Sequence, residues 1–170
     1  KPWQGALNIK RLGGQLRGRV LAGNADIRFN GLQIAGAADL KAGNSHVVLK
    51  GSDGARIDVS ASLQPLDLND LNPEWTGRIN GTGSLQGDRI NPDYLLKLNG
   101  SGLDVMGYRI GRFELDGNTL TAKRSRLFAE DLMISGQAIE RAELVLTGRL
   151  NDAGFQASVL SGLYALDGTG

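Results

Sequence analysis

The strongest pattern in the chain is an unbroken alternation of apolar and polar residues from Ala55 to Leu63. A period of two residues predicts a β-strand that has one apolar face and one solvated face. The same alternation predicts strands along most of the chain, and helical spacing fits few of these stretches. They are Ala6 to Lys10, Ala25 to Asn30, Arg78 to Gln86, Leu96 to Leu103, Arg112 to Asp116, Glu143 to Leu150 and Phe155 to Val159.

Between the strands, the sequence predicts one helical turn and two tight connections. Leucines alternate with acidic and amide residues from Leu66 to Trp75, which fits one short helical turn that Pro73 ends. We expect this turn to plug one end of the fold. Residues 51–54 predict a hairpin connection and residues 88–92 predict a turn. Neither has the composition of a domain linker, so residues 1–170 are expected to be a single β-rich piece, excised from a longer chain because it begins without Met.

The motif L-x-[IV]-x-G occurs three times and indicates an internal repeat. Its copies begin at Leu32, Leu103 and Leu132, and the first copy is looser than the other two in the residues that follow. The starting positions fit a unit of about 30 residues. Repeats of this size favour an elongated stack over a compact fold.

Composition narrows the classes of function. The chain has 25 glycines in 170 residues, about twice average usage, and only 5% aromatic residues, so its apolar surface is aliphatic and suits alkyl chains. The net charge is +1 with the two signs interspersed, which argues against nucleic acid as a partner. The absence of cysteine excludes a thiol nucleophile, a disulfide framework and a thiolate metal site. No apolar run approaches the roughly 18 residues of a membrane helix.

Several short features resemble catalytic or binding motifs, but each has a simpler explanation. His46 is the only histidine and no G-x-S-x-G elbow accompanies it, so we expect a strand histidine. Residues 81–87 look like a phosphate-binding loop, but the third glycine falls one residue late and the strand alternation continues through them. Asp67, Asp70 and Glu74 lack the ligand spacing of a calcium loop, so capping and solvation explain them better. We therefore expect no enzymatic activity, no cofactor and no metal.

The arginines and tryptophans also have simple structural explanations. Most arginines fall on outward strand positions, where a solvated face or cross-strand ion pairs are the default, and lipid headgroup contact at a groove edge is the sharper alternative. The two tryptophans, Trp3 and Trp75, are expected to pack at the ends. The arginines concerned are Arg78, Arg89, Arg109, Arg112, Arg124, Arg126, Arg141 and Arg149.

The apolar positions of the predicted strands form the candidate binding surface. They either fill a closed sandwich or line an open trough, and the sequence leaves both arrangements open. Few aromatic residues and many inward glycines leave little volume to fill the roughly 10 Å between two sheets. In a trough, an acyl chain would contribute about 0.8 kcal/mol per buried CH₂ without any specific polar contact. The predicted groove lining is Ile57, Val59, Leu63, Ile79, Leu85, Leu96, Leu98, Leu103, Val105, Phe113, Leu115, Leu144, Leu146 and Val159.

One stretch of the chain resembles the TamB family, the AsmA-like periplasmic proteins anchored in the inner membrane of Gram-negative bacteria. A short acidic-leucine turn (residues 66–71, LDLNDL) precedes a glycine-rich strand (77–87, GRINGTGSLQG), a proline turn at Asn91-Pro92 and a second strand (98–103, LNGSGL). This order is similar to the recurring module of that family. The clearest part runs from roughly Ile57 to Gly117, and the looser repeat covers most of the chain.

The resemblance implies a fold and two functions. The fold is all-β, an elongated antiparallel or mixed sheet folded lengthwise into a groove or open tube, the β-taco, with an apolar concave face. The chain would be an internal or C-terminal segment of a periplasmic bridge, inner-membrane-anchored elsewhere in the protein, whose groove shields phospholipid acyl chains between the two membranes. Alternatively, the groove or a sheet edge assists assembly and secretion of outer-membrane β-barrel proteins, such as autotransporters, beside a TamA-type barrel. A spacer with a sealed core is a third possibility, and open edges would permit self-association.

Overall fold

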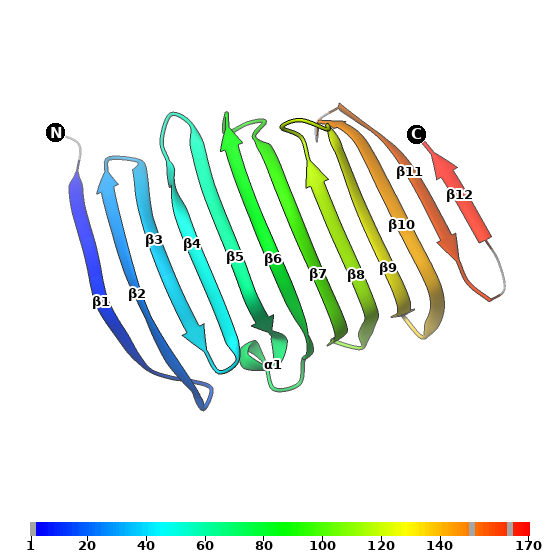
Figure 1. Cartoon of the computed structure of the whole chain (residues 1–170), viewed down its shortest axis with the longest axis horizontal. Coiled ribbons are helices and arrows are strands. Elements are labelled where there is room, and N and C mark those ends of the chain that lie inside the picture. Colours follow the sequence, from blue (N-terminus) through cyan, green and yellow to red (C-terminus); the bar gives the residue numbers. More distant parts are fainter. Residues whose placement is uncertain (1–2, 150–151, 163–164) are drawn as a thin grey trace.

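The computed structural model describes residues 3–149, 152–162 and 165–170, which form one open antiparallel sheet and one short helix (Figure 1). The strands follow one another in chain order, so each pairs with its sequence neighbours. This arrangement confirms the predicted all-β class. The elements are β1 (Gln4–Leu16), β2 (Arg19–Asn30), β3 (Gln33–Ala42), β4 (Ser45–Asp53), β5 (Ile57–Asp67), α1 (Leu68–Leu71), β6 (Thr76–Gly87), β7 (Asp93–Val105), β8 (Tyr108–Asn118), β9 (Arg124–Ile134), β10 (Gln137–Arg149), β11 (Asp152–Leu160) and β12 (Ala165–Thr169).

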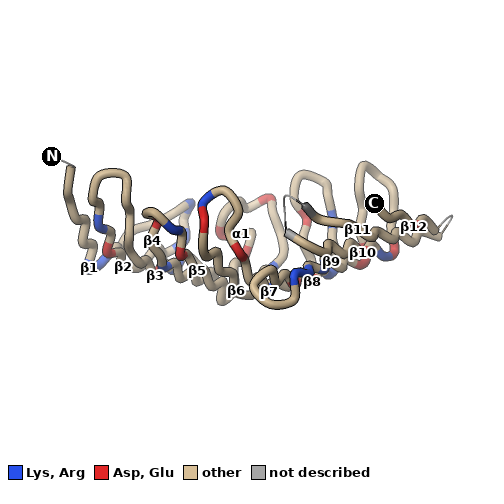
Figure 2. The backbone as a smooth tube through the Cα atoms, turned by 90° about the horizontal axis from the view of Figure 1, so that it is seen from above, with Lys and Arg blue, Asp and Glu red and all other residues tan. Residues whose placement is uncertain are grey.

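The sheet is a single curved layer, with α1 on the inside of the curve (Figure 2). Among the described residues no second sheet covers either face, so these residues form an open trough and not a closed sandwich. The apolar side chains that are buried there are only Leu68, Tyr94, Ala129 and Leu132. The accessible surface is 11153 Å², whereas a compact monomer of this mass would expose about 8,000 Å². Much apolar surface therefore remains uncovered.

Residues that lie opposite one another define rows that cross the sheet. One row, which we name the central row, passes through every strand and contains only leucine, valine, alanine and glycine. The row lies on the concave face, as its member Val47 shows. Ser45 is on the same side of β4 as Val47, and Ser45 bonds to residues 67 and 70 around α1, which lies inside the curve. At about 4.8 Å per strand the row is about 50 Å long. Its members are Leu12, Gly23, Leu40, Val47, Leu63, Gly81, Leu98, Leu115, Leu127, Leu144, Ala157 and Gly168.

The neighbouring row on the convex face is mostly polar. It is displaced by one residue in each strand, and successive side chains of a strand point to opposite faces. The contrast between the two rows makes the sheet amphipathic over its whole length. The convex row consists of Asn24, Asp39, Val48, Ser62, Thr82, Lys97, Asp116, Arg126, Val145, Gln156 and Thr169.

A bulge in β7 keeps two predicted groove residues on the concave face. The pairing of β6 with β7 shifts register between Thr76 and Arg78, which leaves one extra residue in β7. Gly102, at φ 62°, adopts the left-handed conformation at this point. The alternation restarts after the bulge, so Leu103 and Val105 face the same side as the central row.

The second and third copies of the repeat motif form the same structure, and the first copy does not. The motifs at residues 103–107 and 132–136 end in two-residue turns with positive φ at both positions, Met106–Gly107 and Ser135–Gly136. These turns join β7 to β8 and β9 to β10. The motif at residues 32–36 instead begins in a turn, and its Gly36 pairs within β3. The repeat is therefore a hairpin in one half of the sheet only.

Other sequence expectations differ from the structure at their boundaries. The predicted hairpin connection at residues 51–54 is wrong, because Gly51 to Asp53 pair within β4 and the turn follows at residues 54–56. The helical turn is shorter than residues 66–75, since Leu66 and Asp67 still belong to β5. Leu150, the last residue of one predicted strand, lies outside the described residues. Strands β3, β4, β9 and β12 were not predicted from the alternation, although a strand was expected at His46 in β4.

Several inward glycines permit close approach of neighbouring groups, whereas Gly168 at the edge strand has open space at its Cβ position. A Cβ on Gly81 would lie 2.8 Å from the Leu98 Cα and would overlap the Lys97 carbonyl oxygen. Aromatic rings from neighbouring strands cover other glycines: a Cβ on Gly100 would meet Phe113 and one on Gly117 would meet Tyr94. These glycines let backbones and rings crowd on the concave side, as the curvature of the sheet requires.

Candidate functional site

The candidate site is a strip of apolar rows on the concave face. We name the end of the sheet that carries α1 the lower end. The upper row lies beside the central row, on the side away from the lower end. Only one member of the upper row, Ser125, is polar, so the two rows form a continuous apolar strip. The upper row consists of Ile9, Ala25, Ala38, Leu49, Ala61, Gly83, Leu96, Gly117, Ser125, Leu146 and Phe155.

The strand register brings the predicted groove residues together on this face. All of them alternate in phase with the central or upper row, and Leu103 and Val105 do so because of the bulge in β7. Their ligand stays a prediction. Sequence reasoning missed four large apolar members of the central row, on β1, β3, β4 and β9: Leu12, Leu40, Val47 and Leu127. The spacing Gly36, Ala38, Leu40 carries a weak alternation, but small residues give little contrast with their polar neighbours.

A hydroxyl pair satisfies the polar group of the upper row. Tyr94 reaches from β7 across Gly117 to Ser125 on β9, where the Tyr94 Oη and Ser125 Oγ atoms are 2.6 Å apart. Both side chains are buried, and the Tyr94 backbone N–H donates to Thr119 Oγ1 at 2.7 Å. Because both hydroxyls are buried and one bonds to the other, they present little polar surface to a ligand. The apolar character of the strip is therefore maintained at this point.

An ion pair neutralises the upper margin of the concave face. Arg89 donates to Asp53 through Nε at 2.6 Å and through Nη2 at 2.5 Å. The hydrogen bond from Arg89 lowers the pKa of Asp53 from its ordinary value, and the same bond raises the pKa of Arg89. A bidentate pair of this kind has fixed geometry and no net charge. It borders the apolar strip without adding an uncompensated charge.

The acidic residues near α1 differ partly from their sequence interpretation. Asp67 caps α1, since its Oδ1 accepts from the Asn69 backbone N–H at 3.1 Å, as predicted. Asp70, however, is 1% exposed and not solvated. It bonds to Ser45 and lies close to Arg19. Glu74 is exposed, and no group of three or more His, Asp or Glu side chains suited to a metal occurs among the described residues.

The histidine and the glycine-rich motif have the predicted structural positions. His46 lies in β4, and its Nε2 is 2.9 Å from Asp39 Oδ1 on β3. Residues 81–87 lie within β6 and not at a strand-to-helix turn. Trp3 packs against Phe29 with ring centroids 5.6 Å apart, near one edge of the sheet. Each of these residues is thus explained by strand packing.

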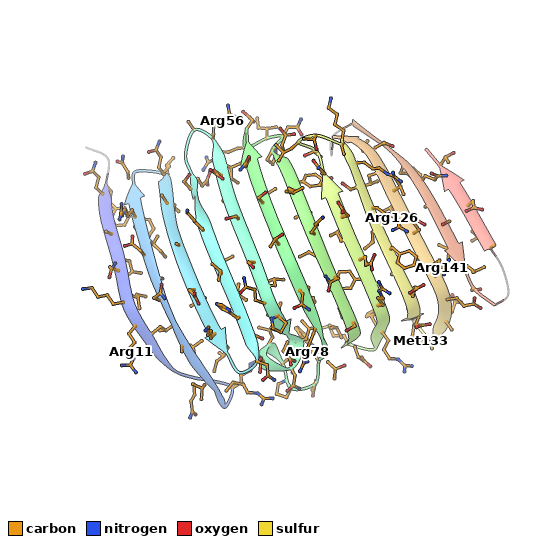
Figure 3. The ribbon with its side chains drawn as sticks, in the orientation of Figure 1. Arg11, Arg56, Arg78, Arg126, Met133 and Arg141 are labelled. Atoms are coloured by element: carbon orange, nitrogen blue, oxygen red, sulfur yellow. The ribbon has the colours of Figure 1, made fainter. Side chains whose placement is uncertain are left out.

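Ion pairs and an aromatic ring order the convex face of β8 to β10 (Figure 3). Arg126 Nε donates to Glu143 Oε1 at 2.5 Å, and Arg141 Nη2 donates to Glu130 Oε1 at 3.3 Å. The guanidinium carbons of Arg126 and Arg141 lie 5.0 and 5.5 Å from the ring centroid of Phe128. The predicted cross-strand ion pairs are therefore present at these positions. A depression of about 500 Å³ between β7 and β8 has lining charges of both signs.

We expect Glu143→Gln to lower stability slightly at neutral pH and to have no effect in acid. The hydrogen bond from Arg126 lowers the pKa of Glu143 in the folded protein. A carboxylate whose pKa is lower in the folded than in the unfolded protein stabilises the fold at any pH above its unfolded pKa. This contribution is lost as the pH falls through the pKa of the folded protein. Melting temperatures of both proteins at pH 7 and pH 3 test this. A difference that persists at pH 3 would contradict an electrostatic origin.

Comparison with known proteins places the chain in a family. No helix among the described residues is long and apolar enough to cross a membrane. Residues 1–167 match the family model described as TamB, N-terminal domain. The sequence had predicted an internal or C-terminal repeat segment of that family. No curated protein matches the chain, and no solved structure matches it.

Proposed function

This chain belongs to the TamB family, whose role lies in membrane-associated transport or assembly, and we propose that its concave face shields phospholipid acyl chains in transit between the inner and outer membranes. It would act in the periplasm as a non-catalytic segment of an inner-membrane-anchored bridge. Contact with a TamA-type outer-membrane barrel would be made through other parts of that protein. The observation that carries the proposal is the unbroken central row, because it offers apolar contact across every strand.

The energetics of the central row suit a mobile acyl ligand. Each methylene taken out of water contributes about 0.8 kcal/mol, so ten methylenes on the row would contribute about 8 kcal/mol. No polar anchor is needed for this, and two polar groups near the row, Asp53 at the upper margin and Ser125 in the upper row, are already paired. Neighbouring positions along the row are chemically alike, and a path of similar weak sites allows a ligand to move on.

Photocrosslinking on the two faces of one strand tests this function. A photoreactive amino acid replaces Leu98, on the central row, or Asn99, its neighbour on the convex face, in the intact protein in cells. Phospholipid adducts identified by mass are expected at position 98 and not at position 99. Equal lipid labelling at both positions, or no lipid at position 98, would overturn the proposal.

The sheet edges favour a second candidate function, the sheltering of unfolded outer-membrane protein strands. Within the described residues, β1 and β12 each pair on one side only, and β1 is 13 residues long. An extended peptide could add to such an edge through backbone hydrogen bonds. A photoreactive residue at Ala6 on β1 would then capture outer-membrane protein segments. Lipid adducts at Leu98 without peptide adducts at Ala6 would exclude this function for β1.

A further inference from the structure

One line of residues interrupts the pairing of β7 to β10. Gly102, Gly111, Asp131 and Glu140 lie opposite one another in neighbouring strands and form none of the described ladder pairs, although the pairs on both sides of them keep the same register. We name these four residues the interruption line. Gly102 and Asp131 have positive φ, 62° and 54°. An irregularity of this kind bends a strand and re-aims the side chains that follow it.

The interruption line switches the side chains of β7 from one face to the other. Arg78 pairs with Ser101, and Thr76 pairs with Asp104. Thr76 and Arg78 are two residues apart in β6 and therefore share a face. Ser101 and Asp104 then share that face as well, although they are three residues apart. Arg78 alternates in phase with the convex row, so Leu103, the neighbour of Asp104, points to the concave face.

Leu103 belongs to an apolar row that lies beyond the interruption line. Directly opposite residues of neighbouring strands share a face. We name this row the hairpin row, and its members are Leu103, Ile110, Leu132 and Ile139. It follows a lower row, which lies beside the central row toward the lower end and is apolar from β6 to β12. The members of the lower row are Ile79, Gly100, Phe113, Ala129, Ala142, Val159 and Leu166.

The hairpin row is packed against the sheet and borders open volume. Leu132 is 8% exposed, and the other three members are half-buried. A depression of about 460 Å³ lies along the row, and its lining contains all four members together with polar neighbours. Apolar side chains beside open volume are the arrangement that an acyl ligand requires.

The repeat motif L-x-[IV]-x-G supplies this row in two hairpins. Leu103 and Leu132 are the first residues of the second and third copies, and an isoleucine of the returning strand pairs with each of them. The first copy instead follows the continuous pairing of β2 with β3, and its Leu32 lies in a turn and is 90% exposed. The likeness of the second and third copies therefore includes the position of an apolar side chain as well as the turn.

We propose that these two hairpins are acyl-binding elements, with the hairpin row extending the apolar strip toward the lower end of β7 to β10. The hairpin row lies three residues beyond the lower row in each strand, so it widens the strip by about 10 Å. Because the row continues the strip on the same face, its occupant is the same phospholipid acyl chain and not a separate partner. This inference rests on the proposed binding of acyl chains.

Photocrosslinking at neighbouring positions of the intact protein in cells tests the hairpin row. The photoreactive residue replaces Leu103 or Asp104 in β7, and Leu132 or Met133 in β9. Lipid adducts are expected at 103 and 132 and not at 104 and 133, because the interruption line turns only the first residue of each pair to the concave face. Leu144, in the central row, reports the binding of acyl chains itself.

Asp131 is the positioning residue of the interruption line on β9. Positive φ is tolerated by Gly, Asn and Asp and resisted by β-branched residues. Asp131→Gly should therefore leave the lipid yield at position 132 unchanged, whereas Asp131→Val should lower it about fivefold or more and leave the yield at 144 unchanged. Gly111→Ala disturbs the same line without changing Asp131, since its Cβ would lie 2.6 Å from the Asp131 Cβ, and it serves if Asp131→Val does not fold.

The outcomes separate this inference from the function on which it rests. Lipid labelling at 104 and 133 as strong as at 103 and 132 would overturn it, as would lipid adducts at 144 without any at 103 and 132. Peptide adducts in place of lipid at 103 and 132 would overturn it too. An unchanged lipid yield at 132 in both Asp131→Val and Gly111→Ala would contradict the role of the interruption line. No lipid adduct at 144 or at the hairpin row would instead refute the proposed binding of acyl chains.

Discussion

Leu98→Asp is expected to abolish acyl-chain binding while leaving the sheet folded. Leu98 lies in the middle of the central row, on a face that is open to water in the structure, so a carboxylate there remains solvated when no ligand is bound. An acyl chain that crosses this position must desolvate the charge or give up its contacts there. Loss of three buried methylenes alone would weaken binding by about 2.4 kcal/mol, or about 50-fold.

Binding of a phospholipid with a fluorescent acyl chain to the intact purified protein measures this effect. Asn99→Asp is the matched control, because it introduces the same charge one residue away on the convex face. Far-ultraviolet circular dichroism checks the fold of both variants. If Leu98→Asp unfolds the protein, the concave face is a sealed interior in the intact protein. If it binds lipid as the unmodified protein does, the central row is not the binding surface.

Gly81→Ala should destabilise the sheet by about 3 kcal/mol or more. Gly81 has φ 139°, a conformation that side-chain-bearing residues rarely adopt. Its Cβ would also overlap the Lys97 carbonyl oxygen on the adjoining strand, so two strands would have to separate at the central row. Steric strain at a special backbone conformation combined with overpacking is among the few causes of losses this large.

Urea unfolding of Gly81→Ala and Gly13→Ala compares a crowded glycine with an open one. Gly13 also lies in a strand, but no heavy atom lies within 4 Å of its Cβ position. Gly13→Ala should therefore stay within about 0.5 kcal/mol of the unmodified protein. Equal midpoints for both variants would mean that β6 and β7 relax around the methyl group, and the curvature of the sheet would not depend on Gly81.

The two predictions concern different consequences of the same curvature. A single sheet that bends in one direction crowds the backbone on its concave side, which explains why glycine recurs there. The same bend gathers leucines from strands that are distant in the sequence into one trough. Stability and the proposed binding therefore depend on neighbouring members of one row, Gly81 for the approach of the strands and Leu98 for the apolar contact.

The alternation of residue types by itself determined which side chains share a face within each strand. The period of two is a local property of the extended backbone, and it placed Leu96 and Leu98, or Leu144 and Leu146, on one apolar side without any knowledge of their neighbours. The same local chemistry indicated the helical turn after residue 66. Strands rich in alanine and glycine, such as β3, gave a weaker signal because small side chains differ little from polar ones in hydrophobicity.

Only the tertiary structure decided how these faces join. Continuity of the central row depends on the register of every strand pair, which turn lengths and bulges set. The apolar positions of β7 change phase between Leu98 and Leu103, and only the structure shows that a bulge at Gly102 accompanies this change. The burial of Asp70 depends on Ser45 and Arg19, which approach it from two other strands. Local pattern cannot encode such contacts, because they arise from residues that only folding brings together.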